Sequence, residues 1–314
     1  MSEGRLRLTI LGGFLGSGKT TWLRHQLHTD AYGNVHVIVN EAADAPVDDA
    51  LLARADQVTL LAGACACCAG QDALITTLLA ICDRRSGDDD PATRGEHIVL
   101  ETSGLADPGA ILSLIQGHPI LARQIVVAET VVIVDALNAG EQVQSETLSR
   151  KQIEAADRLI LTKTDTARAD QVARLRATLA SIAPAAQQSG ALFGSDATLP
   201  DYDAATTKPY SLAVQPETPI HASQLDLGPA PDWTAFTVWL SALLHARGDQ
   251  IVRVKGVVRT PAGRLLVQTV RKSVQSPEIL PDSAMGVPTD NSIAVIGRGF
   301  TQEQLCESLA HFSA

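Results

Sequence analysis

The sequence of 314 residues has little basic charge and no long apolar run, and both absences exclude classes of function. Its 25 lysines and arginines are outnumbered by 35 aspartates and glutamates, which gives a formal net charge of −10. This charge would repel a nucleic-acid backbone except at a local basic patch, so no nucleic-acid partner is expected. No apolar run is long enough to cross a membrane, and residues 1–5 lack the apolar core of a signal peptide. We therefore expect a cytoplasmic protein with no membrane partner.

Cysteine and histidine are also scarce, with five and eight residues in the whole chain. Three of the cysteines, Cys65, Cys67 and Cys68, lie within four consecutive positions. An odd number of thiols so close together does not make a disulfide framework, because adjacent cysteines bridge only with strain. They are also one ligand short of a four-cysteine iron–sulfur site. The cluster therefore indicates metal or redox chemistry in a reducing compartment.

Three thiolates in this arrangement suit a soft transition-metal ion. Zn²⁺ is expected, or Co²⁺ or Ni²⁺ where those are supplied, with an oxygen, nitrogen or water completing the sphere. Glu41, which follows a predicted strand, is placed to approach either this metal or a Mg²⁺ ion. Two alternatives stay open: the cysteines as small buried packing residues, and Glu41 as an exposed loop acid. The histidines are not clustered, so we interpret them as surface or packing residues.

The strongest pattern present is a glycine-rich loop at residues 12–21, with the sequence GGFLGSGKTT. It matches the phosphate-binding pattern G-x-x-x-x-G-K-[ST], and it lies between a strand pattern and a helical pattern, as that motif requires. Lys19 is expected to reach the β- and γ-phosphates of a nucleotide, and the Thr20 hydroxyl to bind Mg²⁺. The expected nucleotide contacts in the loop are Gly13, Gly16, Ser17, Gly18, Lys19, Thr20 and Thr21.

Apolar strand patterns alternate with helical patterns through the first two thirds of the chain. Nearly continuous apolar strands alternating with helices predict an α/β fold, a P-loop NTPase parallel sheet covered by helices on both faces. A solvated loop is expected from Arg84 to Gly95. The expected strands are 35–39, 57–61, 97–100, 131–135 and 158–161, and the expected helices are 71–82, 107–116, 146–156 and 168–182.

The alternation ends near residue 200, where several prolines follow one another between Pro200 and Pro231. Such a proline-rich stretch is typical of a linker. Beyond it, helical patterns at 233–246 and 301–312 and strand patterns near 250–259, 264–270 and 292–296 predict a smaller α+β domain. The predicted domains are residues 1–205 and 206–314.

Glu101, in the segment ETSGLADP, ends one of the apolar strands of the first domain. A carboxylate at such a strand end can hold Mg²⁺ through water or orient an attacking water molecule. Gly104, in the same segment, can approach a γ-phosphate closely. The alternative is a strand-end acid followed by a helix cap at Asp107.

The segment TKTD, residues 162–165, ends another strand, where GTPases read guanine with Asn-Lys-x-Asp. Asp165 would accept hydrogen bonds from the guanine ring N–H and the exocyclic amine, and the stem of Lys163 would pack on the base. Adenine offers no such pair of donors. Thr162 stands in place of the asparagine, which is expected to weaken a contact that braces the loop or reads N7. The alternative is a polar strand-to-helix turn.

Taken in order, these segments resemble the CobW-type P-loop GTPases, a family of metallochaperones and metal-enzyme activators. The likeness covers the whole chain and rests on GGFLGSGKTT, the NE pair, CACC, ETSGLADP and TKTD. In the second domain it rests on Arg253–Gly256 and Ile296–Gly299. Two segments depart from the family pattern. The switch reads NEAAD where the family usually has NEFGE, and a histidine-rich tract near the domain junction is missing.

The resemblance implies hydrolysis of GTP to GDP and phosphate, coupled to binding a transition metal and delivering it to a client metalloprotein or cofactor pathway. It implies Lys19 and Glu101 in the hydrolytic site, and Cys65, Cys67, Cys68 and Glu41 near the metal. Two other classes are left open. A nucleotide-gated metal sensor or store would bind metal without hydrolysing GTP, and a small-molecule kinase would transfer the phosphoryl group to a metabolite. A homo-oligomer, the physiological metal and the client are also left open.

Overall fold

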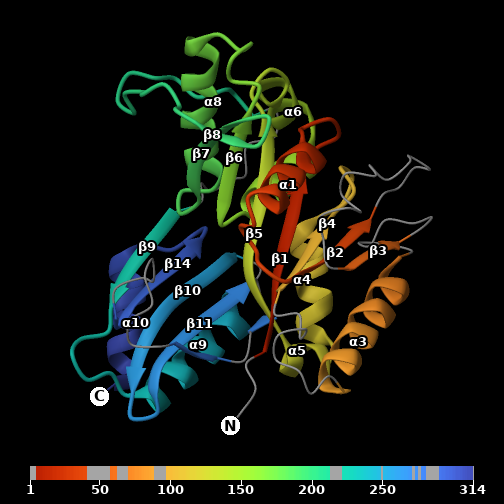
Figure 1. Ribbon diagram of the computed structural model, residues 1–314. Coiled ribbons are helices and arrows are strands. Elements are labelled where there is room, and N and C mark those ends of the chain that lie inside the picture. The colour runs from red at the N-terminus through yellow and green to blue at the C-terminus, as the bar shows by residue number, and fades with distance from the viewer. Residues whose placement is uncertain are drawn as a thin grey trace. The chain divides into compact units, whose positions relative to one another are not determined.

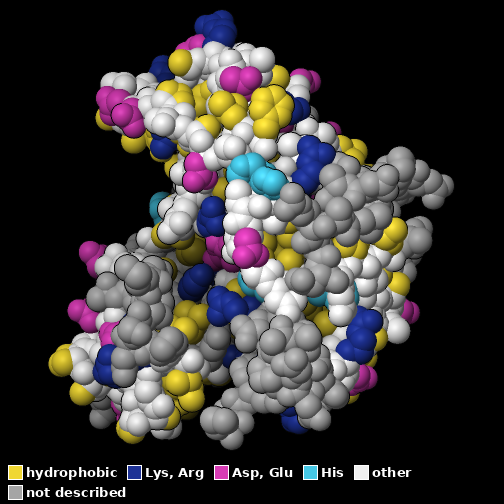
Figure 2. Space-filling view, viewed as in Figure 1, with side chains coloured by type: hydrophobic (Ala, Val, Ile, Leu, Met, Phe, Trp, Pro, Cys, Tyr) yellow, Lys and Arg dark blue, Asp and Glu magenta, His cyan; other side chains and the backbone are white. Residues whose placement is uncertain are grey.

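The computed structural model describes residues 5–40, 57–61, 70–87, 97–212, 221–248, 250–270, 273–274, 277–280 and 290–313. The chain divides into two compact units, Met1–Gln215 and Pro216–Ala314, and the division falls beyond the predicted boundary near residue 205. Among the described residues, no helix is both long and apolar enough to span a bilayer. On the face seen in Figure 2, lysine and arginine side chains occur in several separate places among acidic, apolar and polar ones.

The first unit is built on one eight-stranded sheet in the order β3-β2-β4-β1-β5-β6-β7-β8 (Figure 1). Strands β1 to β7 pair in parallel, and β8 joins β7 antiparallel. The strands are β1 (Leu6–Gly13), β2 (Val35–Asn40), β3 (Gln57–Leu61), β4 (His97–Glu101), β5 (Ile125–Asp135), β6 (Arg158–Thr162), β7 (Gln187–Leu192) and β8 (Ser195–Ala197). The helices are α1 (Lys19–His28), α3 (Gln71–Gly87), α4 (Pro108–Gly117), α5 (Leu121–Gln124), α6 (Ala139–Ser145), α7 (Thr147–Glu154) and α8 (Ala169–Ile182).

Alternate residues of β6 show how helices cover both faces of this sheet. Leu159 and Leu161 pack in one buried cluster with Leu175 of α8, whereas Ile160 packs in another with Leu23 of α1. Because successive side chains of a strand point to opposite faces, α1 and α8 lie on opposite faces. The central strands are buried on both sides, which is why they read as apolar runs in the sequence. The predicted α/β fold is confirmed.

Helix α3 and the strands β7 and β8 differ from the sequence-based expectation. Helix α3 continues through Arg84 and Arg85 to Gly87, so the loop predicted from Arg84 begins too early. The two basic side chains suit the negative end of the helix dipole, and the first helix-breaking residue is Gly87 itself. Strands β7 and β8 were not predicted, because they lie at the edge of the sheet and have a polar, partly exposed composition.

The segment that follows β8, residues 198–212, packs on α8 instead of extending as a free linker. The guanidinium carbon of Arg174 lies 4.3 Å from the ring centre of Tyr210, and that of Arg176 lies 4.8 Å from the ring centre of Tyr202. Arg176 also donates to the carbonyl oxygen of Pro200. Tyr210 is itself partly buried against the apolar cluster of α8. Cation–π and apolar contacts thus attach this segment to the first unit.

The second unit is a smaller antiparallel sheet with two helices, which confirms the predicted α+β architecture. Its strand order is β12-β11-β10-β14-β9, with β13 also paired to β11. Val254 and Val258 of β10 pack with Trp239 of α9 and Leu305 of α10, so both helices cover one face. The elements are β9 (His221–Asp226), α9 (Trp233–Arg247), β10 (Ile251–Thr260), β11 (Gly263–Val270), β12 (Ser273–Val274), β13 (Glu278–Leu280), β14 (Ser292–Gly297) and α10 (Gln302–Ser313).

Candidate functional site

The carboxyl ends of five neighbouring strands meet at one edge of the first sheet. The strands β4, β1, β5, β6 and β7 are adjacent and parallel, so the residues that follow them are brought together. These strands end at Glu101, Gly13, Asp135, Thr162 and Leu192. The phosphate-loop, ETSGLADP and TKTD segments, which are far apart in the sequence, therefore share one edge.

The glycine-rich loop has the backbone that its sequence requires. Gly13 has a φ of 136°, and a Cβ atom there would lie 2.4 Å from the carbonyl oxygen of Ile133 on β5. Gly18 has a φ of 97° and immediately precedes α1, whose first residue is Lys19. Glycine is needed at both positions, because other residues rarely adopt this left-handed region. The loop thus ends at the amino terminus of a helix, where backbone N–H groups attract anions.

The side chain of Lys19 bends back over the loop from which it projects. Its Nζ donates to the carbonyl oxygens of Gly13, at 3.0 Å, and Phe14, at 3.2 Å. These bonds hold the ammonium group above the loop backbone. A positive charge in this place can contact the β- and γ-phosphates of a nucleotide.

Thr20 and Glu101 are brought into contact, although they are 81 positions apart in the sequence. The Thr20 hydroxyl donates to Oε1 of Glu101 at 2.5 Å, and only 4% of Glu101 is exposed. A hydroxyl oxygen and a carboxylate are both hard oxygen ligands of the kind that Mg²⁺ prefers. The two residues proposed from sequence for Mg²⁺ and for the hydrolytic site therefore form one pair.

The loop after β4 lies directly against the phosphate loop at Gly104. A Cβ atom at this glycine would lie 2.7 Å from the backbone nitrogen of Leu15. Gln152 of α7, which is 1% exposed, donates to the carbonyl oxygens of Gly104, at 3.1 Å, and Ala106, at 2.8 Å. Sequence reasoning missed Gln152. A glutamine in the middle of a short helical pattern carries no signal that distinguishes a buried side chain from a surface one.

Asp107, the next acidic residue of the same loop, acts as a helix cap. Its Oδ1 accepts hydrogen bonds from the backbone N–H groups of Gly109, at 2.9 Å, and Ala110, at 3.4 Å. Pro108 occupies the first position of α4, where the missing N–H has no cost. The helix-cap interpretation of Asp107 is therefore confirmed. It is compatible with Glu101 and Gly104 facing the phosphate loop.

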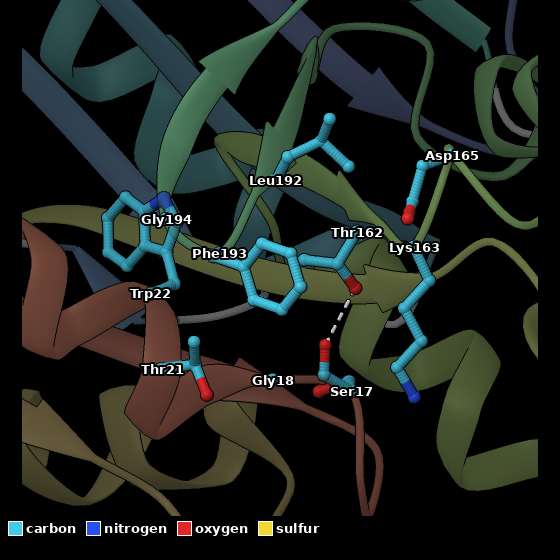
Figure 3. A pocket seen from close by; sticks show the side chains of 10 residues that line it. All are labelled: Ser17, Gly18, Thr21, Trp22, Thr162, Lys163, Asp165, Leu192, Phe193 and Gly194. Atoms are coloured by element: carbon cyan, nitrogen blue, oxygen red, sulfur yellow. Dashed lines mark hydrogen bonds between the residues drawn. The ribbon is translucent and has the colours of Figure 1, made fainter.

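A pocket lies beside the phosphate loop, between α1 and the ends of β6 and β7 (Figure 3). Thr162 braces it, because its hydroxyl donates to the carbonyl oxygen of Ser17 at 2.7 Å. This hydroxyl ties β6 to the phosphate loop, and the expectation that threonine makes a weaker contact than asparagine stays a prediction. The lining residues are Ser17, Gly18, Thr21, Trp22, Thr162, Lys163, Asp165, Leu192, Phe193 and Gly194.

Lys163 links the pocket to both the phosphate loop and β5. Its Nζ donates to the carbonyl oxygen of Gly16 at 2.9 Å and to Oδ2 of Asp135 at 2.7 Å. Asp135, at the end of β5, is buried with 3% exposure. Burial alone would raise the pKa of Asp135, but hydrogen bonds from Lys163, Asn138 and the Leu137 N–H outweigh it and hold the pKa below its ordinary value. Sequence reasoning missed Asp135, since it read only as the polar end of an apolar strand.

Replacing Asp135 with asparagine should lower the free energy of unfolding by about 1–3 kcal/mol at pH 7, because Lys163 loses its charged partner. The depressed pKa means that the ionised carboxylate stabilises the folded state fully above the ordinary aspartate pKa. This contribution is lost as the pH falls through the lower, folded-state pKa. The difference between wild type and D135N should therefore shrink on acidification.

Urea denaturation of both proteins at a series of pH values measures this difference. The exposed Asp201 provides the matched control, because D201N removes the same charge without a buried partner. An equal loss of stability in D135N and D201N would contradict a specific role for Asp135. So would a D135N difference that does not change with pH.

The predicted transition-metal ligands, Cys65, Cys67, Cys68 and Glu41, lie outside the described residues. Within the described ranges, no group of three or more histidine, cysteine, aspartate or glutamate side chains is arranged to hold a metal ion. The two described cysteines, the buried Cys82 and the exposed Cys306, lie in different units. Burial and the nearby Asp83 raise the pKa of Cys82 to about 11, although Arg85 acts to lower it, and the raised pKa makes Cys82 a poor thiolate ligand.

Comparison with known proteins matches almost the whole chain. Residues 7–189 match the family model described as CobW/HypB/UreG, nucleotide-binding domain, and residues 220–313 match the Cobalamin synthesis protein cobW C-terminal domain. The zinc chaperone YjiA of Escherichia coli (strain K12) is 31% identical over 278 residues, covering 85% of this chain and 86% of YjiA. The zinc chaperone CobW of Pseudomonas aeruginosa is 33% identical over 214 residues, covering 58% of this chain and 55% of that protein.

A solved structure extends this likeness to the fold. The crystal structure of Zn(II)-bound YjiA GTPase from E. coli superimposes with a TM-score of 0.60 and 26% sequence identity, covering 99% of both chains. That neighbour is a GTPase by its own description, and the present chain carries the glycine loop, Lys19, Thr20 and Glu101 in one site.

Proposed function

We propose that this chain, which belongs to the CobW/HypB/UreG family of P-loop GTPases, hydrolyses GTP and uses the nucleotide to control binding and delivery of a transition metal. Its relatives in this family are described as zinc chaperones. Zn²⁺ is the first candidate metal, with Co²⁺ or Ni²⁺ as alternatives. The recipient is a client metalloprotein or a cofactor pathway.

The observation that carries the hydrolytic part is the pairing of Thr20 with Glu101 beside Lys19. Lys19 and the backbone N–H groups at the start of α1 would hold the β- and γ-phosphates. Thr20 and Glu101 supply oxygen atoms that fit Mg²⁺, which would neutralise charge on the phosphates. Glu101 would hold the attacking water through its carboxylate. The water oxygen bonds to the γ-phosphorus as the bond to the bridging oxygen breaks, and the water proton passes to the released phosphate, which yields GDP and hydrogen phosphate.

The guanine part rests on the pocket lined by Lys163 and Asp165. Asp165 would accept from the ring N–H and the exocyclic amine, two donors that only guanine presents together. Thr162 and Lys163 connect this pocket to the phosphate loop through the carbonyl oxygens of Ser17 and Gly16. A base bound in this pocket would therefore be linked to the phosphate loop through these two hydrogen bonds.

The proposed metal site is supported by the positions at which β2 and β3 end. Strand β2 ends at Asn40, immediately before Glu41, and β3 ends at Leu61, four positions before Cys65. Both strands run parallel to β4 and β1, so both end at the nucleotide edge of the sheet, the edge where the carboxyl ends of the parallel strands meet beside the phosphate loop. This placement supports a thiolate and carboxylate site that responds to the nucleotide through neighbouring strand ends.

We expect metal and GTP to bind with positive coupling. If a γ-phosphate with Mg²⁺ orders the loops after β2 and β4, Zn²⁺ affinity should be roughly 5–150-fold higher with a non-hydrolysable GTP analogue than with GDP. Linkage requires that metal raises affinity for the GTP analogue by the same factor. Competition with a chelating dye measures the first quantity and calorimetry the second, and Co²⁺ absorbance bands report thiolate ligation.

The variant that tests the ligands is C67S together with C68S, with C306S as the matched control because Cys306 is exposed and lies in the second unit. The double variant should lose high-affinity metal binding, and the control should retain it. Equal Zn²⁺ affinity with GDP and with the GTP analogue would contradict the proposal that the nucleotide controls metal binding. Metal binding without any GTP turnover, even with clients added, would instead favour a sensor or store, and phosphoryl transfer to a metabolite would favour a kinase.

A further inference from the structure

The turn between β7 and β8 presents an exposed aromatic ring at the nucleotide edge. Phe193 and Gly194 form this turn with φ values of 49° and 96°, the left-handed pair that matches the twist of a tight hairpin. Phe193 is 84% exposed, more than any other large apolar residue among those described. Phenylalanine also adopts a left-handed backbone only with strain. An exposed ring on a strained turn costs stability, and such strain often occurs at binding sites.

The turn is fixed to α1, the helix that begins at Lys19. The carbonyl oxygen of Gly194 accepts from Nε2 of Gln26 at 3.2 Å, and the Ser195 hydroxyl hydrogen-bonds with Nε2 of His25 at 2.9 Å. A Cβ atom at Gly194 would lie 2.2 Å from the Cβ of His25, so only glycine allows this approach. The position of the Phe193 ring is therefore set by the same helix that carries the phosphate-binding residues.

The ring lies in the wall of the pocket that faces Thr162 and Lys163 (Figure 3). One side of the pocket is formed by apolar groups from Trp22, Leu192 and Phe193, and the other side by the TKTD segment. A purine has two flat apolar faces and a polar edge. This pocket offers a flat aromatic group for a face and the Asp165 carboxylate for the edge.

We propose that Phe193 stacks on the purine base of the bound nucleotide and closes the pocket over it. The inference rests on the proposed function, because it assumes that a nucleotide occupies this site. The base lies between the Phe193 ring and the TKTD segment, while Asp165 reads its edge. Stacking does not distinguish guanine from adenine, because every base has a π-face. Phe193 therefore supplies affinity for the base, and Asp165 supplies the choice of base.

The test compares F193A, F193W and the control I120A. Ile120 is also an exposed apolar residue, and it precedes α5 and β5 at the opposite edge of the sheet. Calorimetry measures affinity for GDP, a GTP analogue and ATP, and competition measures affinity for Mg²⁺ tripolyphosphate, which has no base. In F193A we expect GDP and the GTP analogue to bind roughly 5–150-fold more weakly, with tripolyphosphate affinity and the GTP-to-ATP ratio unchanged. F193W and I120A should bind as wild type does.

Three results would overturn the proposal. Unchanged GDP affinity in F193A, with wild type binding GDP, would exclude stacking and leave the proposed function intact. A parallel loss of tripolyphosphate affinity would show that the turn supports the phosphate loop and does not hold the base. Wild-type protein that binds neither GDP nor the GTP analogue would contradict the proposed function itself, and stacking with it.

Discussion

Replacement of Lys19 by alanine should lower the rate constant of GTP hydrolysis by ~10²–10³-fold, the loss expected when one group that stabilises developing charge is removed. The ammonium lies above the loop, within 3.0 Å of the Gly13 carbonyl oxygen, where it can contact the phosphates as charge develops in the transition state. A methyl group cannot replace it. Affinity for the triphosphate should fall as well, because charge-assisted hydrogen bonds are the stronger kind.

Single-turnover phosphate release by wild type, K19A and K151A measures this effect. Lys151 is exposed on α7, so K151A removes an equal charge away from the loop and should hydrolyse GTP at the wild-type rate. Thermal unfolding of each variant checks that the loop remains folded without the two carbonyl contacts of Lys19. Hydrolysis by K19A at the wild-type rate, after removal of contaminating enzymes, would disprove the assignment of the phosphate loop.

Replacement of Asp165 by asparagine should exchange guanine for xanthine as the preferred base. Asp165 would accept two hydrogen bonds from guanine, each worth about 1.5–3 kcal/mol when one partner is charged. Losing the bond to the exocyclic amine lowers GTP affinity by roughly 10–150-fold. An asparagine amide donates to the carbonyl that xanthine has in place of the guanine amine, and its oxygen still accepts from the ring N–H. XTP should therefore bind D165N more tightly than GTP does.

Competition between GTP, ATP and XTP for wild type, D165N and D201N measures this exchange. D201N removes an exposed aspartate outside the pocket and should keep the preference for GTP. Equal affinity of wild type for GTP and ATP would show that TKTD does not read guanine. A D165N variant that loses GTP without gaining XTP would place Asp165 in a structural role.

The parts of the site that follow strands of the parallel sheet could be predicted from the sequence. Lys19, Thr20 and Glu101 each belong to a local pattern, and a parallel sheet necessarily collects strand ends at one edge. That Thr20 contacts Glu101 at 2.5 Å agrees with this geometry. The guanine reader and the metal ligands stay predictions, since the first needs a bound base and the second lie outside the described residues.

The residues that sequence reasoning missed act through tertiary contacts that leave no local pattern. Gln152 lies on α7, far in the sequence from the loop after β4 whose carbonyl oxygens it binds. Asp135 is the polar end of an apolar strand. Phe193 belongs to an edge hairpin whose strands have few apolar residues. Strand β9 was missed because flanking prolines suggested a linker, although its pairing with β14 leaves those prolines outside the strand. In β7 and β9, pairing with the distant strands β6 and β14 overrode the local preference of the segment.

The backbone of Lys163 has a consequence for evolution and for engineering. Its φ of 58° places a lysine in the left-handed region, at a cost of roughly 1–2 kcal/mol relative to a residue without this clash. Glycine at this position would relieve that strain. The ammonium group that binds Gly16 and Asp135 would then be lost. Because the buried Asp135 would also lack its charged partner, at a cost of about 1–3 kcal/mol, glycine would not raise stability, and a thermostabilised version of this protein should keep its lysine there.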